Sequence, residues 1–82
     1  MEKDWTVYIV RCADDSLYTG IAKDVDARLR RHNEGSGAAY TRSRRPVRLA
    51  YTEPGLTRSQ ALVREAALKR LPRSEKQRLI SA

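Results

Sequence analysis

The chain has 82 residues, with 17 basic and 10 acidic side chains and a formal net charge of +7. This length predicts a single domain over residues 1–82, and a composition of 40% apolar and 33% charged residues predicts a thin core rather than disorder. No apolar run approaches the roughly 20 residues that cross a bilayer, and the first residues lack the apolar stretch of a signal peptide. One cysteine, Cys12, and one histidine exclude an internal disulfide and a Cys/His zinc cage. We therefore expect a small, basic protein of the cytoplasm that does not contact membranes.

The first third of the chain predicts a β-hairpin followed by a helix. Residues 5–12 (WTVYIVRC) and 17–22 (LYTGIA) are rich in β-branched and aromatic side chains, which is typical of strands. The intervening Asp14-Asp15-Ser16 favours a turn. Asp24 then offers a side-chain oxygen to cap a helix that extends to about Asn33. Two antiparallel strands with a helix packed on them follow from this order.

The middle of the chain predicts a basic loop and a third strand. Residues 38–45 show no hydrophobic period, which indicates a loop. In residues 47–53 (VRLAYTE) apolar and other side chains alternate, as they do in a strand with one buried face. Pro54-Gly55 ends this strand.

The last third predicts two helices. A capping box of Thr57 and Gln60 opens a helix that ends near Leu71, and residues 73–80 form a shorter one with its own Ser-x-x-Gln box beginning at Ser74. Three strands are too few for a barrel. The predicted fold class is therefore α+β: a three-stranded antiparallel β-sheet flanked by helices, in the order β-β-α-β-α-α.

Most of the positive charge lies in one segment. Between residues 28 and 48 there are seven arginines, no lysine, and one acidic residue, Glu34. A solvated basic face would explain such a run, but Arg is well suited to phosphate oxygens, and His32 and Tyr40 lie within the segment. A membrane surface fits less well, because no strong apolar face accompanies the charge. We predict nucleic-acid binding, with these residues as candidate contacts: Arg31, Tyr40, Arg42, Arg44, Arg45 and Arg48.

Glu65 breaks the pattern of the long C-terminal helix. Helical spacing places it among apolar residues, with Ala61 and Leu68 close to the same face. A carboxylate there loses hydration and needs a partner, such as a cation, a hydrogen-bond cluster or a metal ion. An ordinary ion pair with Lys69, four residues later, explains the position equally well.

Four residues in the first half could take part in the same site as Glu65. Arg28 and His32 are one helical turn apart, which suits an anion, although a solvent-facing pair is the simpler interpretation. Tyr8 and Tyr18 lie in strands, where tyrosine usually packs, and share a face if the loop between the strands has an odd number of residues. With one carboxylate, these groups fit a single-metal phosphodiester site for an ion such as Mg²⁺.

The order of these residues resembles the GIY-YIG nuclease superfamily. Thr6-Val7-Tyr8 and Tyr18-Thr19-Gly20 are similar to the two halves of its motif, and Arg28 and Glu65 match later positions. The segment 37–47 (GAAYTRSRRPV) is similar to a stretch typical of its small, stand-alone bacterial members. The resemblance covers nearly the whole chain.

The resemblance implies a function and a set of roles. It implies hydrolysis of nucleic-acid phosphodiester bonds, with one divalent metal ion held by Glu65. We expect DNA as the substrate and Mg²⁺ or Mn²⁺ as the ion. By the same resemblance, Arg28 would stabilise the transition state, Tyr8 would be the general base or position the nucleophile, Tyr18 would orient water or phosphate, and His32 would assist proton transfer. The chain has no room for a separate DNA-reading domain, so we expect little sequence specificity and a preference for structured or damaged DNA.

Two departures from the family pattern leave other functions open. No Asn follows Glu65, although many members have one, and Ala39 stands where the subgroup often has Lys. The alternatives are a non-catalytic nucleic-acid-binding module and a nuclease subunit that needs a protein partner.

Overall fold

A three-stranded antiparallel sheet forms the middle of the molecule. The computed structural model describes residues 2–82, and the strands are β1 (Trp5–Arg11), β2 (Leu17–Ala22) and β3 (Arg48–Leu56). Both β2 and β3 pair with β1, so the strand order is β2-β1-β3 with β1 in the centre. The sheet and the α+β class confirm the prediction from the sequence.

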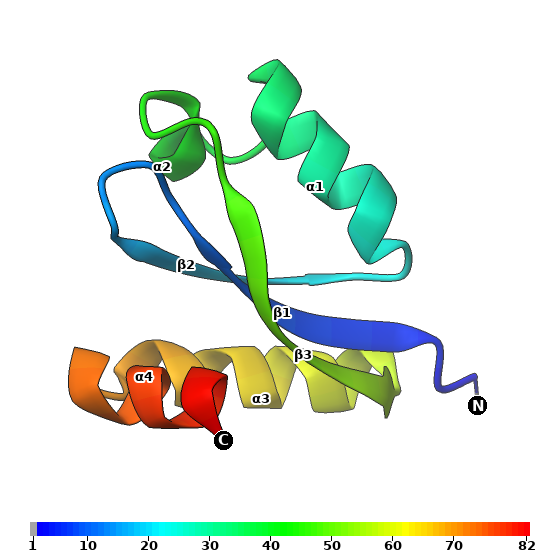
Figure 1. Cartoon of the computed structure of the whole chain (residues 1–82). Coiled ribbons are helices and arrows are strands. Elements are labelled where there is room, and N and C mark those ends of the chain that lie inside the picture. Colours follow the sequence, from blue (N-terminus) through cyan, green and yellow to red (C-terminus); the bar gives the residue numbers. More distant parts are fainter. Residues whose placement is uncertain (1) are drawn as a thin grey trace.

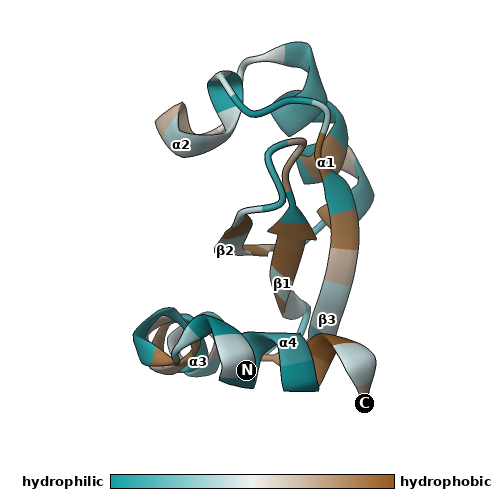
Figure 2. Cartoon of the chain, turned by 60° about the vertical axis from the view of Figure 1, so that its left-hand side comes forward, coloured by the Kyte–Doolittle hydropathy of each residue, from teal (hydrophilic) through white to brown (hydrophobic). Residues whose placement is uncertain are grey.

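The helices form two layers on opposite sides of this sheet (Figure 1). On one side lie α1 (Val25–Glu34) and the short α2 (Ala39–Arg42), and on the other lie α3 (Arg58–Arg70) and α4 (Arg73–Ser81). Figure 2, turned from the first view, shows the apolar strands between the two more hydrophilic helical layers. No helix within residues 2–82 is both long and apolar enough to span a membrane.

The alternation of β1 divides the core between the two layers. Tyr8 and Val10 pack on the α1 side with Val47, whereas Val7 and Ile9 pack on the α3 side. All four β1 side chains are buried, because β1 has a neighbour strand at each edge and a helical layer on each face. The central strand therefore fixes which residues can reach the site on the α1 side.

The predicted helix boundaries agree closely with the structure. The Asp24 side chain accepts a hydrogen bond from the Ala27 backbone and caps α1, which ends at Gly35 in the left-handed conformation with φ 87°. At α3 the side chains of Thr57 and Gln60 form the reciprocal capping box.

Three local predictions need correction. The expected loop over residues 38–45 contains the one-turn helix α2, which is too short to show a hydrophobic period. The third strand continues past Pro54 to Leu56, because β3 is an edge strand and a proline there need not donate to a neighbour. The capping box at Ser74 is wrong, since Pro72 takes the cap position and its carbonyl accepts from the backbones of Glu75 and Lys76.

Candidate active site

A hydrogen bond between Tyr8 and His32 lies at the centre of the candidate site. The Tyr8 hydroxyl, from β1, is 2.9 Å from Nε2 of His32, which comes from the last turns of α1. Both residues are nearly inaccessible, with 2% and 1% of their surface exposed. Two residues that are far apart in the sequence thus form one buried polar pair.

The other ring nitrogen of His32 is also bonded. Its Nδ1 is 2.9 Å from the Oγ1 of Thr41, a fully buried residue of α2. The Thr41 hydroxyl donates in turn to the Ala38 carbonyl at 2.9 Å. The imidazole is therefore held at both nitrogens, and Thr41 is a member of the site that we did not predict from the sequence.

Two glycines leave the space that this arrangement needs. Gly20 is paired with Tyr8 across the hairpin, and a Cβ built at Gly20 would lie 2.5 Å from the Tyr8 hydroxyl oxygen. A Cβ at Gly37 would meet Nδ1 of His32. The glycine of the Tyr18-Thr19-Gly20 motif therefore admits the Tyr8 ring.

Burial keeps both groups of the pair in their neutral forms. It raises the pKa of Tyr8 to about 12, with Tyr18 and Glu65 adding to the rise and Arg28 opposing it. Burial also lowers the pKa of His32 below 6.5, helped by the positive charges of Arg28 and Arg31. At neutral pH the pair is thus a phenol next to an uncharged imidazole.

A small pocket opens beside His32. It has a volume of about 270 Å³, and its lining includes Tyr18, Arg28, Arg31 and His32. The Tyr18 ring meets the His32 ring edge-on, with centroids 5.5 Å apart. In the hairpin Tyr18 pairs with Val10, which lies on the same face as Tyr8, so the two tyrosines share a face as predicted. The pocket combines guanidinium and phenol groups, a combination that suits a phosphate.

Glu65 approaches from the other layer of the molecule. Its side chain, on α3, is 20% exposed and lies 3.4 Å from the Nζ of Lys69, so the predicted i,i+4 ion pair is present. Its negative charge also contributes to the raised pKa of Tyr8, so Glu65 is electrostatically coupled to the buried pair. Arg28 reaches the sheet from α1, and its Nη1 donates to the Ile21 carbonyl of β2 at 3.4 Å.

Glu65 offers a metal ion a single carboxylate. Within residues 2–82 no group of three or more His, Cys, Asp and Glu side chains comes together. A single carboxylate fits an ion such as Mg²⁺, which keeps several waters and completes its shell with substrate phosphate.

Two of the predicted nucleic-acid contacts, Tyr40 and Arg44, make contacts within the protein itself. The Arg44 guanidinium stacks on the Tyr40 ring, 4.0 Å from its centroid, and Nε of Arg44 is 3.1 Å from Asp14. Tyr40 also stacks on Tyr18, with centroids 5.9 Å apart. These contacts tie the basic segment to the β1–β2 loop and support Tyr18, which lines the pocket.

Arg45 is also held internally, whereas three other arginines are not. Its Nε donates to the Arg42 carbonyl at 2.9 Å, and its Nη1 donates to the Asn33 carbonyl at 3.3 Å. Within residues 2–82 no hydrogen bond or ion pair engages the side chains of three predicted contacts: Arg31, Arg42 and Arg48. The structure thus divides the predicted basic contacts into internally bonded and unengaged side chains.

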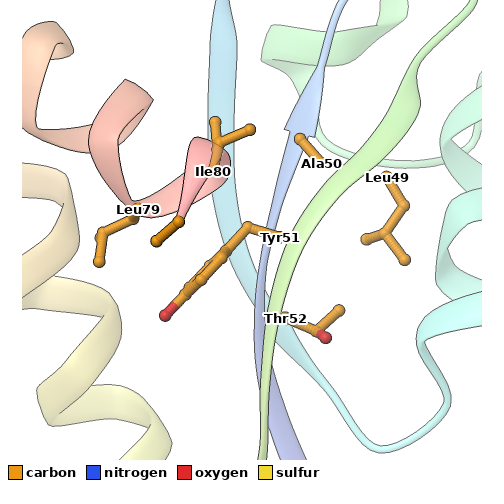
Figure 3. A pocket seen from close by; sticks show the side chains of 7 residues that line it. Leu49, Ala50, Tyr51, Thr52, Leu79 and Ile80 are labelled. Carbon is orange, nitrogen blue, oxygen red and sulfur yellow. The ribbon is translucent and has the colours of Figure 1, made fainter.

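Another hollow lies between β3 and α4, and most of its lining is apolar. Figure 3 shows Tyr51 beside Leu79 and Ile80 of α4, with Leu49 pointing to the opposite side of the strand. The hollow has a volume of about 450 Å³, and its lining contains no charged side chain. The Tyr51 hydroxyl donates to Glu53 at 2.6 Å.

Thr41 could not be identified as a site residue from the sequence. It lies among arginines in a segment without periodicity, and nine positions separate it from His32. Its complete burial, which only the folded chain shows, distinguishes it from its neighbours.

A family comparison assigns this chain to a class of proteins. The family model described as the GIY-YIG catalytic domain matches residues 4–78. The chain therefore belongs to the GIY-YIG family, a class of nuclease domains, as the motif resemblance predicted.

Similar proteins of comparable length carry no assigned activity in their names. The chain is 58% identical over 74 residues to a UPF0213 protein of Staphylococcus aureus (strain Mu3), covering 90% of each. It also resembles the solution NMR structure of the UPF0213 protein BH0048 from Bacillus halodurans, with 43% identity, a TM-score of 0.60, and coverage of 94% of this chain and 82% of that one. A second solution NMR structure, of the protein EF2693 from E. faecalis, has 40% identity and a TM-score of 0.64, covering 99% of this chain and 88% of that one.

Proposed function

We propose that this chain is an endonuclease that needs one divalent ion, Mg²⁺ or Mn²⁺, and hydrolyses phosphodiester bonds of DNA. Structured or damaged DNA is the expected substrate, without strong sequence specificity. The observation that supports this best is the 2.9 Å hydrogen bond between the Tyr8 hydroxyl and His32 Nε2, next to an arginine-lined pocket in a chain of the GIY-YIG family.

Tyr8 and His32 act together to move a proton. With a pKa of about 12, Tyr8 is protonated near neutral pH and is no phenolate base by itself. The attacking water gives a proton to the Tyr8 oxygen while Tyr8 passes its own proton to Nε2 of His32, whose lowered pKa keeps it neutral and able to accept. The proton then leaves His32 toward the pocket that His32 lines.

Arg28 and Tyr18 act on the phosphate. Both line the pocket beside His32. The Arg28 guanidinium neutralises the charge that grows on the phosphate oxygens as water attacks. Tyr18 orients the phosphate or the water, because its ring is held between those of His32 and Tyr40.

Glu65 would hold the metal ion. When bound, the ion supplies Lewis-acid stabilisation of the phosphate charge. With no ligand cluster in residues 2–82, the ion would be held by one carboxylate, waters and substrate, as Mg²⁺ can be. Glu65 would have to give up its ion pair with Lys69, and a partly exposed pair of this kind contributes little stability.

The unengaged arginines bind the DNA backbone. Arg31, Arg42 and Arg48 are the strongest candidates, because their side chains have no internal partner within residues 2–82. Tyr40, Arg44 and Arg45 make internal contacts, and the two arginines add to the positive potential of the basic segment. Contacts of this kind fix position on the duplex without reading bases.

Incubation with DNA tests this proposal directly. The purified protein is given supercoiled plasmid and branched or flapped oligonucleotides, with Mg²⁺, Mn²⁺ or a chelator. We expect nicking or cleavage with either ion and none with chelator. Equal cleavage with chelator would contradict the role of the metal, and no cleavage of any substrate would contradict the enzyme.

A second candidate function is a non-catalytic nucleic-acid-binding module, or a nuclease subunit that needs a protein partner. The specific observation in its favour is the ion pair of Glu65 with Lys69, which gives the carboxylate a cation without any metal. Binding of Mn²⁺ at Glu65, read from paramagnetic broadening of nearby amide signals, distinguishes the two. A module that binds DNA but shows no broadening at Glu65 fits the second candidate.

A further inference from the structure

The hydrogen bonds around His32 run in one direction only. Thr41 has a single hydroxyl proton, and its Oγ1 lies 2.9 Å from two groups: the Ala38 carbonyl and Nδ1 of His32. Both contacts can be hydrogen bonds at once only if the Thr41 proton goes to Ala38, because a carbonyl can only accept. The remaining lone pairs of Oγ1 must accept the bond from His32, which places a proton on Nδ1.

That assignment determines what the other nitrogen can do. A neutral imidazole carries one proton, so a proton on Nδ1 leaves a lone pair on Nε2. Nε2 is 2.9 Å from the Tyr8 hydroxyl, which therefore donates to it. In the opposite tautomer, Nδ1 and the Thr41 oxygen would face each other without a proton, because Thr41 has given its own to Ala38.

We propose that Thr41 is a positioning residue that selects the Nδ1–H tautomer of His32 and so keeps Nε2 free to accept the Tyr8 proton. Its effect on cleavage rests on the proposed function, whereas its effect on the tautomer does not. Thr41 does not line the pocket and acts through His32 alone.

The local fold supports this role for the hydroxyl. Thr41 is fully buried, and it is the only buried residue of the one-turn helix α2. Its backbone N–H also donates to Ala38, at 3.1 Å, so the hydroxyl and the amide converge on the same carbonyl. Gly37 leaves no side chain against the imidazole on this side. Helix α2 thus places the Thr41 hydroxyl so that its oxygen accepts a hydrogen bond from Nδ1 while its proton is donated to Ala38.

NMR of the imidazole tests the proposal without any substrate. His32 is the only histidine of the chain, so a long-range ¹H–¹⁵N spectrum of the labelled protein contains a single imidazole. In the wild type above the His32 pKa we expect a protonated Nδ1 and an unprotonated Nε2. Thr41→Ser keeps the hydroxyl and should keep this pattern. Thr41→Val keeps the shape and removes the hydroxyl, and should shift the imidazole toward the Nε2–H form.

The same variants give a second readout in DNA cleavage. Thr41→Val should lower the single-turnover rate by about 100-fold, because general-base catalysis contributes roughly 10²–10⁴-fold. Thr41→Ser should keep most of the rate, which a purely packing role would not predict. Thr41→Ala replaces the valine variant if that one does not fold.

Three results would overturn the proposal. They are an Nε2–H tautomer in the wild type, an unchanged Nδ1–H tautomer in a folded variant without the hydroxyl, and a serine variant as impaired as the valine one. If the wild type cleaves no DNA, the proposed function fails, but the tautomer of the variants still decides the role of Thr41.

Discussion

The Tyr8 ring lies over Gly20, its partner in the β1–β2 register, so closely that only glycine fits there. A Cβ at Gly20 would be 2.5 Å from the Tyr8 hydroxyl oxygen and 2.7 Å from the ring carbon that carries it. The backbone of the edge strand β2 and the buried Tyr8–His32 pair are thus mutually dependent. A change in either must move the other.

Gly20→Ala should therefore displace Tyr8 from His32. We expect a loss of stability of about 1–3 kcal/mol, typical of an overpacked core, together with a large loss of cleavage rate. Chemical unfolding measures the first, and the His32 imidazole signal reports whether the hydrogen bond survives. An alanine variant with an unchanged imidazole signal would show that the close approach is not required.

Tyr8→Phe removes the hydroxyl and keeps the ring. The rate should fall by roughly 10²–10⁴-fold if Tyr8 carries the proton of the attacking water. Stability should fall by about 1–3 kcal/mol, because Nε2 of His32 is left buried without a partner. Tyr51→Phe is the matched control, since its hydroxyl bonds to Glu53 in another part of the molecule. Equal rates for the two variants would remove Tyr8 from the mechanism.

The sequence was sufficient to predict that the two site tyrosines share a face. Five residues, 12–16, separate the paired Arg11 and Leu17, and an odd loop preserves the parity of the hairpin. Periodicity and capping also predicted α1 and α3, because their signals are local. These features depend on spacing along the chain, which any sequence displays directly.

The roles of individual arginines could not be predicted in the same way. In the sequence, Arg42, Arg44 and Arg45 are equivalent members of one basic segment. In the structure, Arg44 contacts Asp14 and Arg45 donates to the Asn33 carbonyl. The Arg42 side chain has no partner among residues 2–82. Those pairings depend on how the segment after α1 returns to the sheet. Such a path is set by tertiary contacts and leaves no periodic trace in the sequence.

The stability of the protein should fall as the solution is acidified past the usual pKa of histidine. His32 has a lowered pKa in the folded state, so below about pH 6.5 the unfolded chain binds more protons than the folded one. The contribution of neutral His32 is complete above that pH and is lost on going down to the folded-state pKa. Unfolding of wild type and His32→Gln at several values between about pH 7 and pH 5 measures the effect. A slope in the glutamine variant equal to that of the wild type would assign the pH dependence to other groups.

Glu65→Gln tests the metal without changing the size of the side chain. Cleavage with Mg²⁺ or Mn²⁺ should be abolished, because the charge that attracts the ion is gone. The fold should persist, since the pair with Lys69 is partly exposed and contributes only about 0–1 kcal/mol. Glu75→Gln on α4, where the carboxylate pairs with Arg78, is the matched control and should keep full activity. Undiminished metal-dependent cleavage by folded Glu65→Gln would refute this role for Glu65.

Arg28 and Arg42 carry the same charge, but replacing the first should lower the cleavage rate and replacing the second should lower DNA affinity. Arg28 borders the pocket beside His32, whereas the Arg42 side chain has no partner within residues 2–82 and is free for a backbone phosphate. A contact with the transition state lowers the barrier, while a positioning contact binds ground state and transition state equally. Arg28→Ala should therefore lower the saturated single-turnover rate by about 100-fold or more with little loss of affinity.

Arg42→Ala should weaken binding at the same saturated rate, and should reduce the dependence of log affinity on log salt concentration by about 0.9 for the one phosphate contact removed. Arg44→Ala is a poorer comparison, because it also breaks the contacts with Asp14 and Tyr40 and should destabilise the fold. Rates at saturating protein and affinities at several salt concentrations, on one oligonucleotide and on its scrambled version, separate these effects. If Arg28→Ala and Arg42→Ala lose only affinity, Arg28 belongs to the general basic surface, and the chain is better described as a nucleic-acid-binding module.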